Sequence, residues 1–229
     1  MTSIQRVAMI ASLALLVALL AGLFVRRLYR VCYSFPTWLL AVLAGDVLMF
    51  FWPERFYTWG FWMAKETAYA ALKIAIAIEI TVLAFQAFPS AGATVRRVLL
   101  GVLLALLAFV LIGVRYDVAL QDLARELQRR VANGVALVFC AAWAVVLYYR
   151  LPLHRLHRAI LRGLVPYLLV FAAASTLTLV FGWDVRTAVN AAEAACWALM
   201  LAYWCGEVWR RPARDDSAFM RRLQPWRSI

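Results

Sequence analysis

Seven long apolar segments follow one another along the chain. A lipid bilayer is crossed by about 20 mostly apolar residues in helical form, and backbone amides in lipid must bond within their own segment. Prolines mark several segment ends, where a missing amide does least harm. The pattern predicts transmembrane helices over residues 7–25, 35–52, 61–88, 98–114, 131–149, 160–181 and 187–209.

Basic residues divide unequally between the two sides of this predicted bundle. Fifteen fall on the side with the C-terminal tail and the loops after the first, third and fifth helices, and eight fall on the other. Basic loops stay in the cytoplasm, so we expect the N-terminus outside and the C-terminus inside. The first apolar run is too long for a signal peptide and leads directly into Arg26 and Arg27, so we expect it to be retained.

One stretch departs from this charge pattern. Residues 115–130 carry four arginines on the predicted outer side, between the fourth and fifth helices. Ala119, Leu120, Leu123 and Leu127 recur there at helical spacing. This spacing predicts an amphipathic helix that lies on the membrane surface.

Composition excludes the common soluble classes. Apolar residues make up 66% of the chain and charged residues 16%, against about 45–50% and about 25% in soluble domains. The excess must face lipid, so nucleic-acid binding is not expected despite the net charge of +12. We expect an all-α integral membrane protein, multi-pass in a bacterial inner membrane, with a seven-helix transmembrane domain over residues 1–209 and a basic amphipathic cytoplasmic tail over residues 210–229.

Several ionisable residues lie inside the predicted spans, where charge is costly and usually faces the bundle interior. We expect Asp46 and Glu193 in the outer half and Lys73 somewhat deeper, near the middle, with Lys73 paired to one of the two carboxylates. Neighbours at helical spacing extend this set. The candidate ligand-binding or ion-binding residues are Asp46, Glu66, Tyr69, Lys73, Asn190, Glu193 and Trp197. In the alternative interpretation, the ion pair only fixes helix register.

Polar residues at other depths suggest a second arrangement. Glu79, Gln86 and Glu207 could continue from Asp46 and Lys73 as a path for protons or cations. Such a path would make the protein a transporter or channel. The spans lack the paired glycine or proline breaks of many carriers, so this hypothesis ranks second.

Signals for metal or catalytic chemistry are weak. His154 and His157 have a spacing that can share a metal ion, but no acid or thiol nearby completes a ligand set. We interpret these histidines as contacts to lipid headgroups. The chain has no HExxH, GxSxG or CxxC motif, so we expect no enzyme activity, metal or cofactor.

The predicted helix count, helix length and orientation resemble the seven-helix sensing modules that precede signalling domains in some bacterial receptors. This resemblance implies a sensor that binds a small molecule or ion and signals to a cytoplasmic protein partner through its tail. Anionic headgroups of the bilayer are the other expected partner. The alternatives are the transporter and an accessory subunit of a larger membrane complex.

Overall fold

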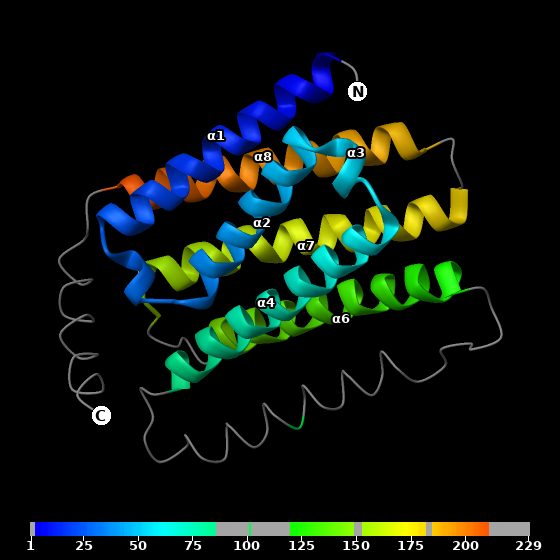
Figure 1. Cartoon of the computed structure of the whole chain (residues 1–229). Coiled ribbons are helices and arrows are strands. Elements are labelled where there is room, and N and C mark those ends of the chain that lie inside the picture. The colour runs from blue at the N-terminus through cyan, green and yellow to red at the C-terminus, as the bar shows by residue number, and fades with distance from the viewer. Residues whose placement is uncertain (1–2, 86–100, 102–119, 149–152, 182–184, 211–229) are drawn as a thin grey trace.

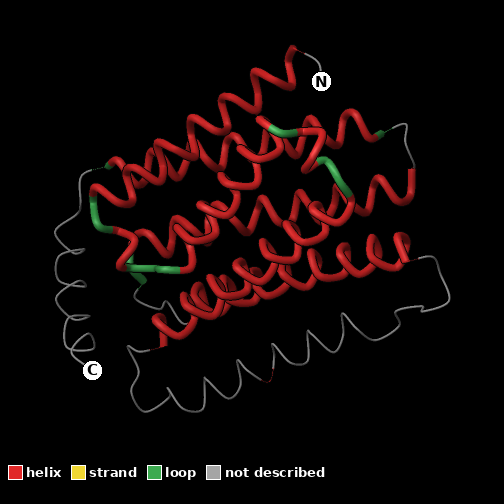
Figure 2. Tube along the Cα trace, in the orientation of Figure 1, coloured by secondary structure: helices red, strands yellow, loops and turns green. Residues whose placement is uncertain are grey.

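The computed structural model describes residues 3–85, 101, 120–148, 153–181 and 185–210, which form helices joined by short loops and contain no strand (Figure 2). Six long helices, one short α-helix and one 3-10 helix make up the described chain. They are α1 Ser3–Val25, η1 Leu28–Arg30, α2 Ser34–Phe51, α3 Pro53–Phe56, α4 Trp59–Phe85, α6 Leu120–Tyr148, α7 Arg155–Phe181 and α8 Arg186–Trp209.

The long helices coincide with six of the seven predicted apolar segments. The remaining segment, over residues 98–114, lies outside the described residues, as do Gln86 and residues 211–229 of the tail. Within the described ranges, four helical stretches are long and apolar enough, by length and composition, to cross a membrane. They are Ser34–Phe51, Trp59–Ala84, Glu126–Tyr148 and Arg155–Thr178.

The structure changes the interpretation of residues 120–130. They are helical, as predicted, but they continue without a break into the following apolar segment as the single helix α6. No proline separates the two parts, and an ion pair of 2.6 Å between Glu126 and Arg130 braces consecutive turns. The polar part of the described stretch is therefore the first third of a long helix and not a separate one.

The six long helices close into a ring. α1 packs against α2, α2 against α4, α4 against α6, α6 against α7, α7 against α8, and α8 against α1 (Figure 1). Aromatic side chains fill the space between α2 and α8. The rings of Trp38 and Trp204 meet edge to face with centroids 6.0 Å apart, and Phe35 meets Trp204 at 5.0 Å. These three side chains are fully buried and anchor the core.

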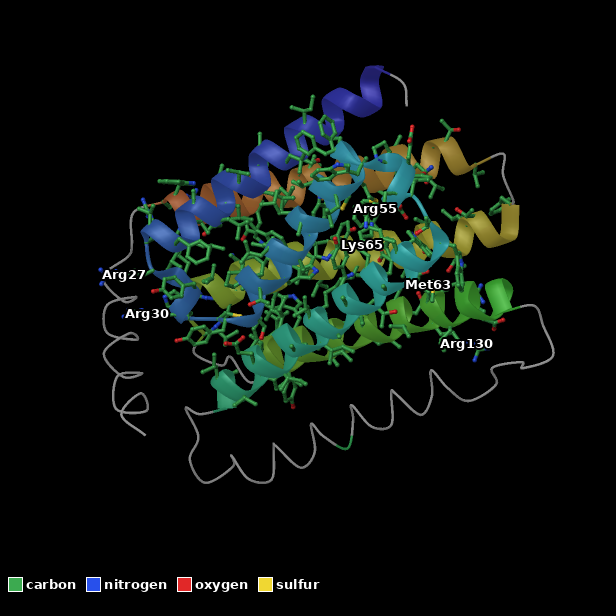
Figure 3. All side chains as sticks on the ribbon, viewed as in Figure 1. Arg27, Arg30, Arg55, Met63, Lys65 and Arg130 are labelled. Carbon is green, nitrogen blue, oxygen red and sulfur yellow. The ribbon has the colours of Figure 1, made fainter. Side chains whose placement is uncertain are left out.

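Helix ends gather at two opposite ends of the bundle. α1 and α8 finish at the same end at which α2 and α7 begin (Figure 1), and we call this the Arg26 end. Arg27 and Arg30 lie there, whereas Arg130 lies at the other end (Figure 3). The Arg26 end is the one that the charge pattern assigns to the cytoplasm.

Candidate ligand-binding site

Tyr69 joins α4 to α2 at the centre of the candidate site. Its hydroxyl donates to the backbone carbonyl oxygens of Ala41 at 3.2 Å and Val42 at 3.4 Å. Gly45 makes this approach possible, because a Cβ atom at that position would collide with the Tyr69 hydroxyl. Tyr69 is buried, so its main role in this structure is to fix the spacing of two helices.

Lys65 lies beside this contact, although the spacing argument did not select it. Its Nζ atom lies 3.5 Å from Oε1 of Glu66 and 5.6 Å from the centre of the Tyr69 ring. Asp46 on α2 interacts electrostatically with both Lys65 and Glu66. α2 and α4 therefore contribute two carboxylates and one ammonium to a shared cluster.

Lys73 does not form the predicted ion pair. In the described part of the chain, it makes no salt bridge to Asp46 or to Glu193, and its strongest charged neighbour is Glu66 on its own helix. The prediction was wrong because spacing fixes the face of a helix but not the distance to the next helix. Lys73 is thus a partly buried cation that no described residue neutralises by a direct salt bridge.

α8 supplies the acidic group on the opposite side. Glu193 interacts electrostatically with Glu66 and with Tyr167 on α7. Trp197, one helical turn further, contacts the Tyr167 ring at 5.4 Å and the Trp38 ring at 6.0 Å. We call Asp46, Lys65, Glu66, Tyr69, Lys73, Tyr167 and Glu193 the mixed-charge cluster. Trp197 lies at its border.

Two observations separate the cluster from the predicted site. Asn190 is exposed on α8, and no hydrogen bond joins it to the cluster within the described residues. Tyr167 was missed, because a tyrosine in an apolar helix is also typical of the aromatic belt at a membrane surface. The sequence did hold one signal for Tyr167, its position directly after Pro166 and well inside α7.

Glu79, a member of the candidate ion path, caps a helix. Its Oε1 atom accepts a hydrogen bond from the Tyr33 amide at 2.8 Å, and its Oε2 atom accepts one from the Ser34 amide at 2.9 Å. The Cys32 thiol also donates to Oε2, at 3.3 Å. Glu79 thereby satisfies amides at the start of α2 that have no partner within the helix.

Glu207, another member of that path, bridges two arginines. Its Oε2 atom accepts from Nε of Arg155 at 2.8 Å, and its Oε1 atom accepts from Nη1 of Arg210 at 3.0 Å. Arg155 also donates to the Glu207 carbonyl oxygen at 3.0 Å. Both carboxylate oxygens are therefore engaged: Oε2 joins α8 to the start of α7, and Oε1 bonds the arginine that ends α8.

The two histidines are buried, so their assignment to headgroup contact was wrong. His154 precedes α7, and its Nδ1 atom accepts from the Leu156 amide at 3.1 Å, as an N-cap side chain does. His157 is fully buried, with Nε2 3.2 Å from the carbonyl oxygen of Val31. Because a carbonyl only accepts, Nε2 of His157 carries the proton. Each ring forms a hydrogen bond with the backbone.

No group of three or more histidine, cysteine, aspartate or glutamate side chains in the described ranges is arranged to hold a metal ion. The mixed-charge cluster instead combines carboxylates, ammonium groups and phenols from four helices. No known protein family, curated protein or solved structure matches the chain, so its function is inferred from its own residues.

Proposed function

We propose that the chain is a helical membrane sensor whose mixed-charge cluster binds a small polar molecule or ion. The observation that carries the proposal is Lys73, which lies inside a helix fit to span a membrane and makes no salt bridge among the described residues. An ionisable group at such a place is costly and is usually kept for function. A purely structural ion pair would bring the partners into contact.

The charges of the cluster indicate the ligand class. Lys65 pairs with Glu66 at 3.5 Å, and the cluster holds two further carboxylates, Asp46 and Glu193, and one further ammonium, Lys73. Acidic groups on α2 and α8 with a cation on α4 suit a zwitterionic ligand. The ammonium group of the ligand would lie toward the carboxylates, and its acidic group would lie toward Lys73. The alternative ligand is a simple cation that the two carboxylates bind.

Binding is better supported than conduction. A path for ions needs polar groups that are open to the passing ion at successive depths. Glu79 and Glu207 would be two of its steps, but their oxygens accept hydrogen bonds from the backbone and from arginine. A transporter would have to break these contacts in each cycle.

α8 offers a route for the signal. Glu193 lies in the cluster, Trp204 donates from Nε1 to the Ala159 carbonyl oxygen of α7 at 2.9 Å, and Glu207 bonds Arg155 at the start of α7. These residues share one face of α8. A ligand that shifts α8 near Glu193 would therefore move the Arg26 end, where the tail begins.

In this proposal the protein is a seven-span protein of the bacterial inner membrane, with its N-terminus outside and its C-terminus in the cytoplasm. The arginines at the Arg26 end support the orientation, and the polar first third of α6 is the part that would lie in the outer interface. The tail would reach a cytoplasmic partner.

Thermal unfolding in lipid nanodiscs tests the proposal. A panel of amines, amino acids and inorganic cations should contain a ligand that raises the unfolding temperature of the wild type, and Glu193→Gln should abolish that shift. Lys73→Met should also abolish it, while the unliganded variant becomes more stable because a poorly neutralised buried charge is gone. Glu54→Gln, on α3 outside the cluster, is the control.

The outcomes separate the hypotheses. An unchanged shift in Glu193→Gln removes that residue from the site. Ligand-free protein that copurifies with a stoichiometric membrane partner would favour an accessory subunit. Cation flux in proteoliposomes that is lost in Glu79→Gln would favour transport.

A further inference from the structure

A second site lies at the Arg26 end, away from the mixed-charge cluster. A pocket of about 310 Å³ opens there between the end of α1, the start of α7 and the end of α8. We call it the arginine pocket. Its polar lining residues are Arg26, His154, Arg155, Glu207 and Arg210.

The polar part of the pocket is cationic. Three guanidinium groups, those of Arg26, Arg155 and Arg210, line it together with the single carboxylate of Glu207. That carboxylate lies between Arg155 and Arg210, so three guanidinium groups face one carboxylate among the described residues that line the pocket. The Arg210 side chain is 72% exposed and can turn toward a bound anion.

Arg26 has a positioning role. Its guanidinium donates to the backbone carbonyl oxygens of Trp209, at 2.7 Å, and Arg210, and it also lies over the Trp209 ring. These bonds satisfy carbonyl groups at the end of α8. They hold Arg210 at the pocket rim and keep the charge of Arg26 beside it.

The other part of the pocket is apolar. Leu156, Ala159 and Val208 are buried there, and Leu28 completes this side. A free inorganic anion would gain nothing from such a surface. An anion joined to hydrocarbon would place its charge at the arginines and its first carbons on the leucines, alanine and valine.

The pocket lies where the apolar helices end. The apolar stretch of α1, Met9–Val25, stops immediately before Arg26, and the candidate span of α7 starts at Arg155. The phosphate groups of a bilayer lie just outside its hydrocarbon region. A bilayer that covers these apolar stretches would therefore place its phosphate groups at the level of the arginine pocket.

We propose that the arginine pocket binds the phosphodiester group of an anionic phospholipid such as phosphatidylglycerol. Arg210, whose side chain is exposed at the pocket, donates to the phosphate oxygens, since guanidinium groups match phosphate geometry. The glycerol and upper acyl carbons lie against Leu156, Ala159 and Val208. Basic pockets between helices at a cytoplasmic surface are suited to such headgroups. The site is independent of the proposed sensor function.

Lipid titration of the full chain tests this site. Delipidated protein is placed in phosphatidylcholine nanodiscs with increasing fractions of phosphatidylglycerol, and retained phosphatidylglycerol is counted by native mass spectrometry. Arg210→Gln should lower the affinity about fivefold, since one arginine near an anionic lipid surface contributes about 1 kcal/mol and 1.4 kcal/mol is tenfold. Glu207→Gln should raise the affinity, because the repelling carboxylate is removed.

Arg158→Gln is the matched control, because Arg158 is exposed on α7 near Arg155 but does not line the pocket. It should bind like the wild type. Equal losses in Arg158→Gln and Arg210→Gln would show general attraction to a basic surface and overturn the site. Inorganic phosphate and glycerol phosphate, added to pure phosphatidylcholine nanodiscs, should not raise the unfolding temperature. If they protect as well as phosphatidylglycerol does, a free anion is the occupant and the lipid proposal is wrong.

Discussion

Glu79 on α4 caps the start of α2 through Ser34, whose amide nitrogen lies 2.9 Å from the Glu79 Oε2 atom. The same carboxylate accepts a hydrogen bond from the Tyr33 amide at 2.8 Å. A carboxylate at a helix N-terminus also interacts favourably with the helix dipole. One acidic side chain therefore fixes the connection between α1 and α2 from a helix far along the chain.

Removal of this cap should destabilise the fold. We expect Glu79→Ala to lower the free energy of unfolding by about 1–3 kcal/mol, because two amides lose their acceptor. Glu79→Gln should cost less, since its amide oxygen still accepts. Denaturant unfolding in detergent micelles measures both. Glu54→Gln, on the short helix α3, should change little. Equal stability of Glu79→Ala and the wild type would contradict the capping role.

A second cap predicts a residue-specific rescue. His154 accepts the Leu156 amide through Nδ1 at the first turn of α7. Alanine at this position should lower the free energy of unfolding by about 1 kcal/mol. Asparagine, a strong N-cap residue, should recover most of that loss. Thermal unfolding of His154→Ala and His154→Asn checks the order. If both variants lose the same stability, the imidazole acts by packing and not as a cap.

The sequence predicted the helices well because their signal is local. Apolar runs of sufficient length define α1, α2, α4, α6, α7 and α8 without knowledge of their neighbours. The start of α7 was placed late, at residue 160, because Arg155, His157 and Arg158 are polar and resemble a loop. In the structure, His157 is buried against the carbonyl of Val31, a tertiary contact that hydropathy does not report.

The site was only partly predictable for the same reason. Spacing correctly placed Glu66, Tyr69 and Lys73 on one face of α4, but the ring order of the helices decides which charges meet. The Glu79 carboxylate accepts hydrogen bonds from two backbone amides that lie 45 and 46 positions away in the sequence. No periodicity in either helix marks that partnership, so a capping carboxylate was indistinguishable from a member of an ion path.

Close helix packing gives a matched pair of glycine variants. At Gly163 on α7, an added Cβ atom would come within 2.5 Å of Trp204 Nε1, and that ring is held by its bond to Ala159. Gly163→Ala should therefore cost about 1–3 kcal/mol through overpacking. Gly206→Ala on α8 meets nothing within 4 Å and should gain up to about 1 kcal/mol from helix propensity. Shifts of the unfolding midpoint in the same direction in both variants, relative to the wild type, would contradict this packing.

The thiol of Cys32 should resist alkylation in the folded protein. Burial raises the pKa of Cys32 well above its usual value, and the charge of Glu79 raises it further. The thiolate is the reactive form, so a maleimide at mildly alkaline pH should label Cys32 far more slowly in the native state than in denaturing detergent.

A variant with alanine at Cys140, Cys196 and Cys205 keeps Cys32 as its one thiol, so mass spectrometry of this variant measures the labelling of Cys32 alone. In the same background, Cys32→Ala with Arg30→Cys gives the control, since position 30 is exposed in the same connection and should be labelled rapidly in both states. Glu79→Gln should speed the labelling of Cys32, because it removes the neighbouring negative charge. Native labelling of Cys32 as fast as that of the control thiol would mean that the connection opens in solution and that Glu79 does not hold it.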